Sequence, residues 1–471
     1  MGCSFDKGAR MNNILVSRYS DLNSSDAIKR LSRLEVDPIS DLHDNTVEQA
    51  CLRISNAWKA TFVPTRAVVE IMREQIECAQ AHASVYFQDQ KSLLTLGFEG
   101  AHDVEPYFPT CLTGLAGTGK SQLQTALVRL FCRKEYTIKL DGHTSLPLTT
   151  FTRLSVKGQK SISQILRPLC KPEIASGSAK VSEPEIIANG AKWQYLTGGC
   201  LFAIDELQFL AQSQAATTLI TRVLLALAEV RTPWFFGANY SLCWKLRERP
   251  SEAKQRLLSR PIVLVPDAPG SECWEGVLKA YERVVRGSFG FEFKERKFEL
   301  WNYTAGIKRQ LVTLLTHAYR LCRRRGAWEV KWADVDRAYD SLEYSTLRSD
   351  VALLIAHAAQ GGTLRQDLMC PFMDDVSNES VEGYKAELRN ARANKVIAAA
   401  IESSMTVAER QALKSITNTT DSHDEKGTGS VVKLRRPSKP SLAALQQAGR
   451  DFKSESSQWQ AAQSQRPSSD E

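Results

Sequence analysis

The sequence has few residues that could build a metal centre, a disulfide framework or a membrane anchor. Only 7 histidines and 11 cysteines occur among 471 residues, and no two cysteines have the C-x-x-C spacing of a zinc site. No apolar run approaches the ~18 residues that a transmembrane helix needs. The N-terminus also lacks the apolar segment of a secretion signal. We therefore expect a cytoplasmic protein with reduced thiols and no membrane contact.

The composition is that of an ordinary globular protein with a modest excess of positive charge. Hydrophobic residues make up 43% and charged residues 24%, which is enough to build a full α/β core. The formal net charge is +8. Such a surplus permits a polyanionic partner without identifying one.

The distribution of apolar residues divides the chain into five regions. Short apolar strands alternate with amphipathic helices between residues 107 and 345, which predicts a parallel sheet with helices on both faces. From about Thr417 the composition is polar and predicts disorder. The predicted regions are an N-terminal extension (1–60), an α/β core (61–285), a helical lid (286–345), a helical C-terminal region (346–416) and a disordered tail (417–471).

A glycine-rich motif lies between a predicted strand, YFPTCLTG, and a predicted helix. The segment GLAGTGKS matches G-x-x-x-x-G-K-[ST], the P-loop that binds nucleotide phosphates with backbone N–H groups and a helix N-terminus. We predict that Lys120 reaches the β- and γ-phosphates of ATP and that Ser121 ligates Mg²⁺. An unrelated glycine-rich turn would not require the flanking strand and helix. The predicted nucleotide-binding residues are Gly114, Leu115, Ala116, Gly117, Thr118, Gly119, Lys120, Ser121 and Gln122.

A second strand, LFAIDE, ends in two carboxylates. After a P-loop this is the Walker B pattern, in which Asp205 would orient Mg²⁺ and Glu206 would act as general base toward the attacking water. The alternative is a buried strand that runs into an acidic helix cap, since acidic residues favour helix N-termini. The P-loop upstream favours the catalytic interpretation.

A third strand, PWFFGANY, places Asn239 just beyond its end. A polar side chain there fits the sensor 1 position of an AAA+ ATPase, which holds the attacking water. The alternative is an asparagine that only forms the turn.

The segment KQRLLSRPIVLVP predicts a helix that ends near Arg260 and a strand over Ile262–Val265. In AAA+ ATPases an arginine at this helix end reaches the γ-phosphate of the neighbouring subunit, and such a finger can raise the rate ~10³–10⁵-fold. Arg256, which leucine follows, is the first candidate and Arg260 the second. Either residue could instead be a solvated helix arginine.

The predicted lid contains GIKR at the start of the helix IKRQLVTLLTHAYRL. Arg309 in this pattern could fold over the phosphates as sensor 2. The alternative is an ordinary surface arginine.

Two basic segments are candidates for contact with DNA phosphates. Residues 294–337 carry eleven Lys/Arg against five Asp/Glu, a local charge of +6. Lys157 and Lys160 follow the predicted strand TFTRLSV and could line the pore of an assembled ring. Both segments could instead be solvated surface. The lid candidates are Arg323, Arg324 and Arg325.

These motifs together resemble the TnsC/TniB-type AAA+ regulators of large bacterial transposons. The resemblance covers about residues 60–345 and rests on FVPTR near Pro64, CLTGLAGTGKSQLQTAL, and LFAIDELQFL with Gln208 after the acidic pair. It implies an α/β AAA+ P-loop fold in a bacterial cytoplasmic protein. It also implies an ATP-dependent homo-oligomer, ring or filament, that coats duplex DNA and links target-selection proteins to a transposase.

Two other functions fit the same motifs. The first is a helicase-loader or initiator-like AAA+ ATPase, which a winged helix after the lid would favour. The second is a nucleotide-gated scaffold that binds ATP without useful hydrolysis. Glu206 and the arginine candidates argue against the scaffold.

Overall fold

The computed structural model describes residues 14–101, 103–139, 145–157, 161–177, 181–207, 216–360 and 364–372, all within one compact unit, residues 1–395. Lys160, Gln208 and the predicted tail (417–471) lie outside the described residues. Within the described ranges, no helix has both the length and the apolar character needed to cross a bilayer.

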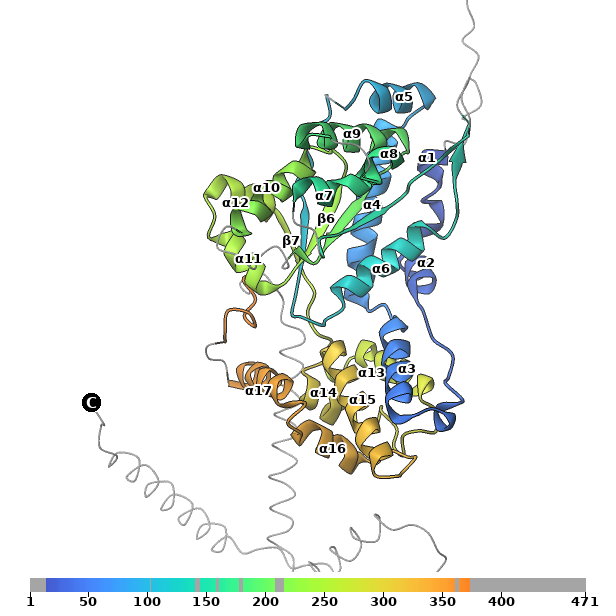
Figure 1. Cartoon of the computed structure of the whole chain (residues 1–471), viewed down its shortest axis with the longest axis vertical. Helices are drawn as coiled ribbons and strands as arrows, with labels where there is room; N and C mark the ends of the chain where they lie inside the picture. The colour runs from blue at the N-terminus through green and yellow to red at the C-terminus, as the bar shows by residue number, and fades with distance from the viewer. Residues whose placement is uncertain are drawn as a thin grey trace, which may run out of the picture. The chain divides into compact units, whose positions relative to one another are not determined.

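The core is a five-stranded parallel sheet in the order β4-β5-β6-β1-β7 (Figure 1). This confirms the predicted parallel α/β architecture. The P-loop follows β1, Asp205 ends β5 and Glu206 follows it, and Asn239 follows β6, so the three motifs meet at one edge of the sheet. The predicted strand at Ile262 starts two residues earlier, because Arg260 and Pro261 pair with the first half of β1. The strands are β1 (Thr110–Thr113), β2 (Thr137–Ile138), β3 (Leu146–Pro147), β4 (Thr152–Ser155), β5 (Phe202–Asp205), β6 (Trp234–Ala238) and β7 (Arg260–Val263), of which β2 and β3 form a separate antiparallel pair.

Helices cover both faces of the sheet because side chains alternate along each buried strand. Leu112, Ala203 and Phe235 pack with α4 and α6 on one face. Phe202 and Phe236 face the other way and pack with α7, α9, α10 and α11 (Figure 1). The α-helices are α1 (Ile14–Ser17), α2 (Ser25–Ser32), α3 (Val47–Ala60), α4 (Arg66–Tyr86), α5 (Gln90–Phe98), α6 (Lys120–Phe131), α7 (Ile162–Leu166), α8 (Pro172–Ala175), α9 (Glu183–Leu196), α10 (Ala216–Ala228), α11 (Tyr240–Arg247), α12 (Ser251–Leu257), α13 (Glu272–Val284), α14 (Lys297–Thr304), α15 (Lys308–Arg324), α16 (Trp332–Asp340) and α17 (Ser345–Gln360).

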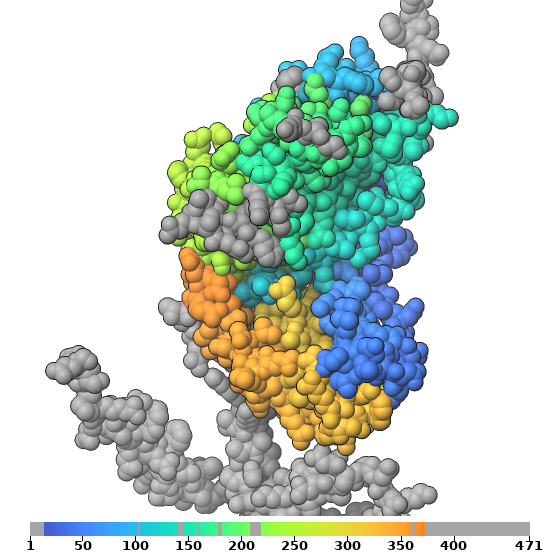
Figure 2. Space-filling model, in the orientation of Figure 1, coloured from blue at the N-terminus to red at the C-terminus, as the bar shows by residue number. Residues whose placement is uncertain are grey.

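A second hydrophobic core joins α3 to the helices of the lid. Helix α3 begins with a capping box, in which the side chains of Thr46 and Gln49 each bind the other's backbone N–H. Trp58 of this helix is fully buried, and its indole N–H donates to the carbonyl oxygen of Tyr281 in α13 at 2.8 Å. Helix α3 therefore belongs to the lid core, and Figure 2 shows its blue surface beside the yellow and orange lid helices.

Candidate functional site

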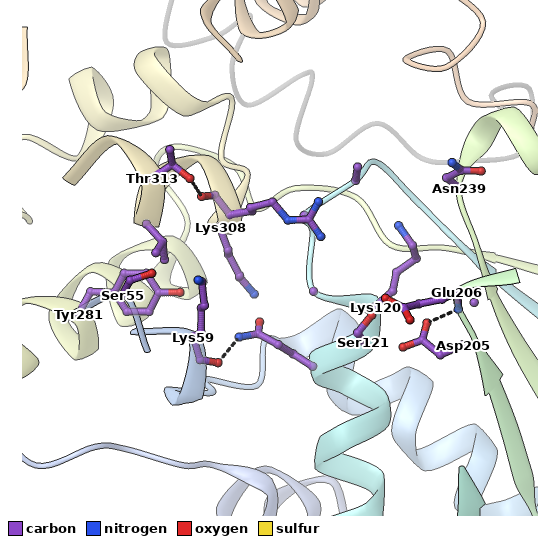
Figure 3. A pocket seen from close by; sticks show the side chains of 17 residues that line it. Ser55, Lys59, Lys120, Ser121, Asp205, Glu206, Asn239, Tyr281, Lys308 and Thr313 are labelled. Atoms are coloured by element: carbon purple, nitrogen blue, oxygen red, sulfur yellow. Dashed lines mark hydrogen bonds between the residues drawn. The ribbon is translucent and has the colours of Figure 1, made fainter. Parts of the chain in front are cut away.

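A cavity of about 420 Å³ lies at the carboxyl edge of the sheet, between the P-loop, the lid and α3 (Figure 3). Among the predicted residues, it is lined by Ala116, Gly117, Gly119, Lys120, Ser121, Gln122, Asp205, Glu206, Asn239 and Arg309. It is also lined by residues that the sequence analysis did not single out, namely Ser55, Lys59, Gly237, Tyr281, Lys308, Val312 and Thr313. Gly114, Leu115 and Thr118 support the loop from behind, where Thr118 donates to the carbonyl oxygen of Leu115 at 3.0 Å.

Two glycines give the P-loop its shape. Gly117 and Gly119 have φ values of 93° and 112°, which L side chains rarely adopt. Gly119 is the N-cap that directly precedes the first residue of α6, Lys120, so the N-terminus of that helix lies at the cavity. A Cβ on Gly117 would lie 2.6 Å from the Cβ of Arg309. Only glycine therefore lets the lid helix α15 approach the loop this closely.

Lys120 is held against the P-loop by two carbonyl oxygens. Its Nζ donates to Gly114 at 2.7 Å and to Leu115 at 2.8 Å. Burial, and to a smaller extent the nearby charge of Arg309, lower the pKa of Lys120 to about 8. A bound phosphate would raise the pKa of Lys120 again, because its negative charge stabilises the ammonium form.

The carboxylates at the end of β5 occupy different surroundings. Asp205 is 5% exposed and forms an ion pair with Arg153 of β4, at 2.7 Å between Oδ2 and Nη2. Its Oδ1 accepts a hydrogen bond from the backbone N–H of Glu206 at 2.9 Å. Glu206 itself has a φ of 62°, an unusual value for a residue other than glycine, and lines the cavity. The strained residue is thus the predicted general base.

The donor set of this cavity suits a hard divalent cation. The Ser121 hydroxyl and the Asp205 carboxylate both line it, and Mg²⁺ prefers oxygen ligands of these kinds together with nucleotide phosphates. Ser121 and Asp205 would hold the ion, which would shield the phosphate charge during hydrolysis.

Asn239 is placed for both of the roles considered for it. Its Oδ1 accepts a hydrogen bond from the N–H of Leu242 at 3.0 Å and so caps α11. The same residue lines the cavity on the side of Lys120 and Glu206 (Figure 3). The cap fixes the amide at the end of β6, so the turn-forming role does not exclude contact with a bound molecule.

The lid and α3 make the cavity positively charged. Arg309 and Lys308 come from the start of α15, and Lys59 comes from the end of α3. With Lys120 they make four cations against the two carboxylates of Asp205 and Glu206. That surplus of two charges complements a magnesium–ATP complex. No sequence motif marks Lys59 as a site residue, because only the packing of α3 against the lid brings it to the cavity.

The two candidate finger arginines lie away from this cavity. Arg256 pairs with Glu252 within α12 at 2.9 Å, and its guanidinium lies 5.9 Å from the ring centroid of Phe108. Arg260 is the first residue of β7 and lines a separate groove of about 230 Å³ beside Thr110 and Trp234, which begin β1 and β6. The arginines thus lie toward the amino ends of strands whose carboxyl ends hold the nucleotide motifs. Neither arginine lines the nucleotide cavity.

The candidate DNA-binding residues differ in how freely they could meet a phosphate. Lys157 is exposed just beyond β4. Arg323 donates to the carbonyl oxygen of Leu42 at 3.0 Å and lies 3.8 Å from the ring centroid of Trp328. Arg324 pairs with Glu48 at 2.9 Å, and Arg325 pairs with Asp334 at 2.7 Å. The lid arginines therefore use much of their charge within the molecule, whereas no ion pair is described for Lys157.

Comparison with known proteins gives similarity at the level of solved structures. No family model matches the chain, and no curated protein is similar to it. The Aeropyrum pernix ORC1 protein in complex with DNA is 19% identical over 59% of this chain and 69% of its own, with a TM-score of 0.36. Cdc6p from Pyrobaculum aerophilum is 15% identical over 65% and 79%, with a TM-score of 0.35. The ADP form of the Aeropyrum pernix ORC2 protein is 15% identical over 61% and 75%, with a TM-score of 0.37.

The fold itself follows from the geometry of the chain. A parallel sheet carries the P-loop after β1, an acidic pair after β5 and a polar residue after β6, and a helical lid reaches back over the same edge. The described part of the chain therefore has a P-loop α/β fold, in which a helical lid covers the nucleotide edge of a five-stranded parallel sheet.

Proposed function

We propose that this protein is an ATP-hydrolysing AAA+ switch that assembles into an oligomer and acts on duplex DNA. The observation that carries the proposal is the cavity in which Lys120, Glu206 and Arg309 meet from three separate parts of the chain. A site that only binds a nucleotide would not need a carboxylate in the position of a general base.

Each residue has a distinct part in the proposed reaction. Lys120 and the N–H groups of the P-loop bind the β- and γ-phosphates, and Arg309 contacts the phosphates from the lid. Asn239 orients the attacking water so that its oxygen lies in line with the γ-phosphorus. Glu206 accepts the proton of this water. The magnesium ion held by Ser121 and Asp205 supplies charge neutralisation.

The position of the finger candidates supports an oligomer. Arg256 and Arg260 lie away from the nucleotide edge of their own sheet, so an arginine of either position would act on the cavity of a neighbouring subunit. The charge that develops on the γ-phosphate would then be stabilised only after assembly. Hydrolysis would in this way depend on contact between copies.

The DNA-binding part of the proposal rests on charge. The chain carries a net charge of +8, and exposed Lys157 follows the edge strand β4. Phosphate contacts of this kind favour nucleic acid without reading its sequence.

Two forms of this function are distinguished by their partners. As a transposition regulator, which the resemblance of residues 60–345 favours, the protein would bind a transposase and a target-selection protein. As an initiator or helicase loader, the alternative that lies nearer in kind to the compared ORC and Cdc6 structures, it would bind a replicative helicase. Co-purification of the ATP-bound, DNA-associated protein with each partner decides between them.

Release of phosphate from ATP, measured with and without duplex DNA, tests the shared part of the proposal. We expect turnover that DNA stimulates and that Lys120→Ala abolishes. Tight ATP binding without turnover under either condition would instead identify a nucleotide-gated scaffold.

A further inference from the structure

Arg153 of β4 is a charged residue beside the site that the nucleotide motifs do not include. Its side chain is 33% exposed, while that of its partner Asp205 is 7% exposed, so the arginine approaches the buried carboxylate from the solvent side of the edge strand. It is not among the residues that line the cavity. Arg153 therefore contacts Asp205 from behind, where it does not obstruct a bound nucleotide.

The guanidinium of Arg153 makes two contacts with different elements. Nη2 donates to Oδ2 of Asp205 at 2.7 Å, and Nη1 donates to Oγ1 of Thr125 in α6 at 3.0 Å. The Thr125 hydroxyl in turn donates a hydrogen bond to the carbonyl oxygen of Ser121, at 2.9 Å. One planar side chain thus links the Walker B strand to the first turns of the P-loop helix.

We infer that Arg153 is a positioning residue that ties the two predicted magnesium ligands, Ser121 and Asp205, to each other. The inference rests on the proposed function, because it concerns the same metal site. Groups that hydrogen-bond to metal ligands fix their orientation, and their loss typically costs ~10–100-fold in metal affinity. Arginine suits the role because its rigid fork serves two acceptors at once, which the single ammonium of lysine does not.

The backbone reinforces this link. Among the strands that the structure describes, β4 pairs only with β5, and Ser155 is the register partner of Asp205. The N–H of Val156 also donates to the carbonyl oxygen of Asp205 at 3.5 Å. The end of β4 therefore holds Asp205 through both its side chain and its backbone.

The test measures binding of Mn²⁺, as a paramagnetic probe for Mg²⁺, to the full chain with a non-hydrolysable ATP analogue. Free Mn²⁺ is counted by electron paramagnetic resonance, and affinity for the analogue is measured separately in EDTA. We expect Arg153→Ala to weaken Mn²⁺ binding ~10–100-fold with little change in metal-free analogue affinity. Arg133→Ala, which breaks another arginine–aspartate pair (to Asp21, 2.9 Å) outside the cavity, is the matched control and should leave Mn²⁺ affinity unchanged.

Two milder variants keep the test decisive if Arg153→Ala fails to fold, which is a real danger when a buried carboxylate loses its partner. Thr125→Val removes only the bridge to Ser121 and should weaken Mn²⁺ binding ~5-fold, as expected for one hydrogen bond. Arg153→Lys keeps the charge but not the forked guanidinium, so it should weaken Mn²⁺ binding as much as Thr125→Val does. The double variant should bind Mn²⁺ no more weakly than either single variant.

The outcomes separate this inference from the proposed function. Unchanged or tighter Mn²⁺ binding in Arg153→Ala and Thr125→Val, with normal binding in the parent, overturns the positioning role alone. Failure of the parent protein to bind Mn²⁺ with the analogue overturns the proposed nucleotide function itself.

Discussion

At the scale of single residues, the charge of Lys120 depends on what surrounds it. Burial and Arg309 lower its pKa to about 8 in the free protein, while a triphosphate favours the charged form. ATP therefore binds the protonated lysine, and above pH 8 the neutral amine must first take up a proton. ATP affinity should be fully present below pH 8 and lost as the pH rises beyond it.

We predict that ATP affinity falls ~10-fold between pH 7 and pH 9, with about one proton taken up on binding at the higher pH. Calorimetry at pH 9 in two buffers of different ionisation enthalpy measures that uptake. Arg309→Ala removes a charge that depresses the pKa, so it should move the fall in affinity to higher pH. A flat profile through pH 9 in the parent protein would contradict this account of Lys120.

Glu206→Gln should retain ATP binding and lose turnover. The amide has nearly the shape of the carboxylate but cannot accept a proton, and Asp205 remains to hold the metal. The loss expected for a general base is ~10²–10⁴-fold. Single-turnover phosphate release measures it directly, and a rate near that of the parent would remove Glu206 from the mechanism.

At the scale of elements, the sequence predicted the strands whose positions follow from the local pattern of apolar and polar residues. The strands before the P-loop, at Asp205 and before Asn239 were confirmed, since each is a short apolar run with a polar end. The packing of α3 against the lid was not predicted, although Ile54 and Trp58 repeat at helical spacing. Pattern shows that a helix has an apolar face but not which partner covers it. For the same reason neither Lys59 nor Arg153 could be predicted at the site from the sequence.

The close approach of the lid to the P-loop leads to a prediction for Gly117. Gly117→Ala adds a Cβ 2.6 Å from that of Arg309, at a φ of 93°. The strain of about 1–2 kcal/mol should push α15 from the loop and weaken ATP binding ~10-fold. Gly270→Ala is the matched control, because nothing lies within 4 Å of its added Cβ.

Isothermal calorimetry with ATP compares these two variants, and circular dichroism checks that both fold. Gly270→Ala should bind as the parent does. Equal ATP affinity in folded Gly117→Ala would show that contact between α15 and the P-loop does not matter for binding.

At the scale of the whole molecule, the two candidate finger arginines and the nucleotide cavity lie toward opposite ends of the sheet. An Arg256→Ala subunit keeps a complete cavity, and a Glu206→Gln subunit keeps its arginine. Mixing the two inactive proteins should therefore restore phosphate release, because one supplies what the other lacks. Loss of a finger should cost ~10³–10⁵-fold in rate, so even partial recovery is measurable.

The same mixing experiment with Arg260→Ala identifies which arginine acts. Recovery with one variant and full activity of the other alone assigns the finger. No recovery at any mixing ratio for either variant would argue that both arginines are structural and that the active sites are not shared between subunits.

Fluorescence anisotropy of a labelled duplex tests whether ATP controls the binding of an oligomer of this protein to duplex DNA. The measurement uses Glu206→Gln with ATP over ~50–300 mM salt, with Lys120→Ala as the protein that cannot bind ATP. We predict binding that needs ATP, ignores DNA sequence and weakens steeply with salt. Lys157→Ala should make that salt dependence shallower by about one unit per subunit, whereas substitution of Arg323 to Arg325 should not. An absence of ATP-dependent binding even at ~50 mM salt would contradict ATP control of DNA binding.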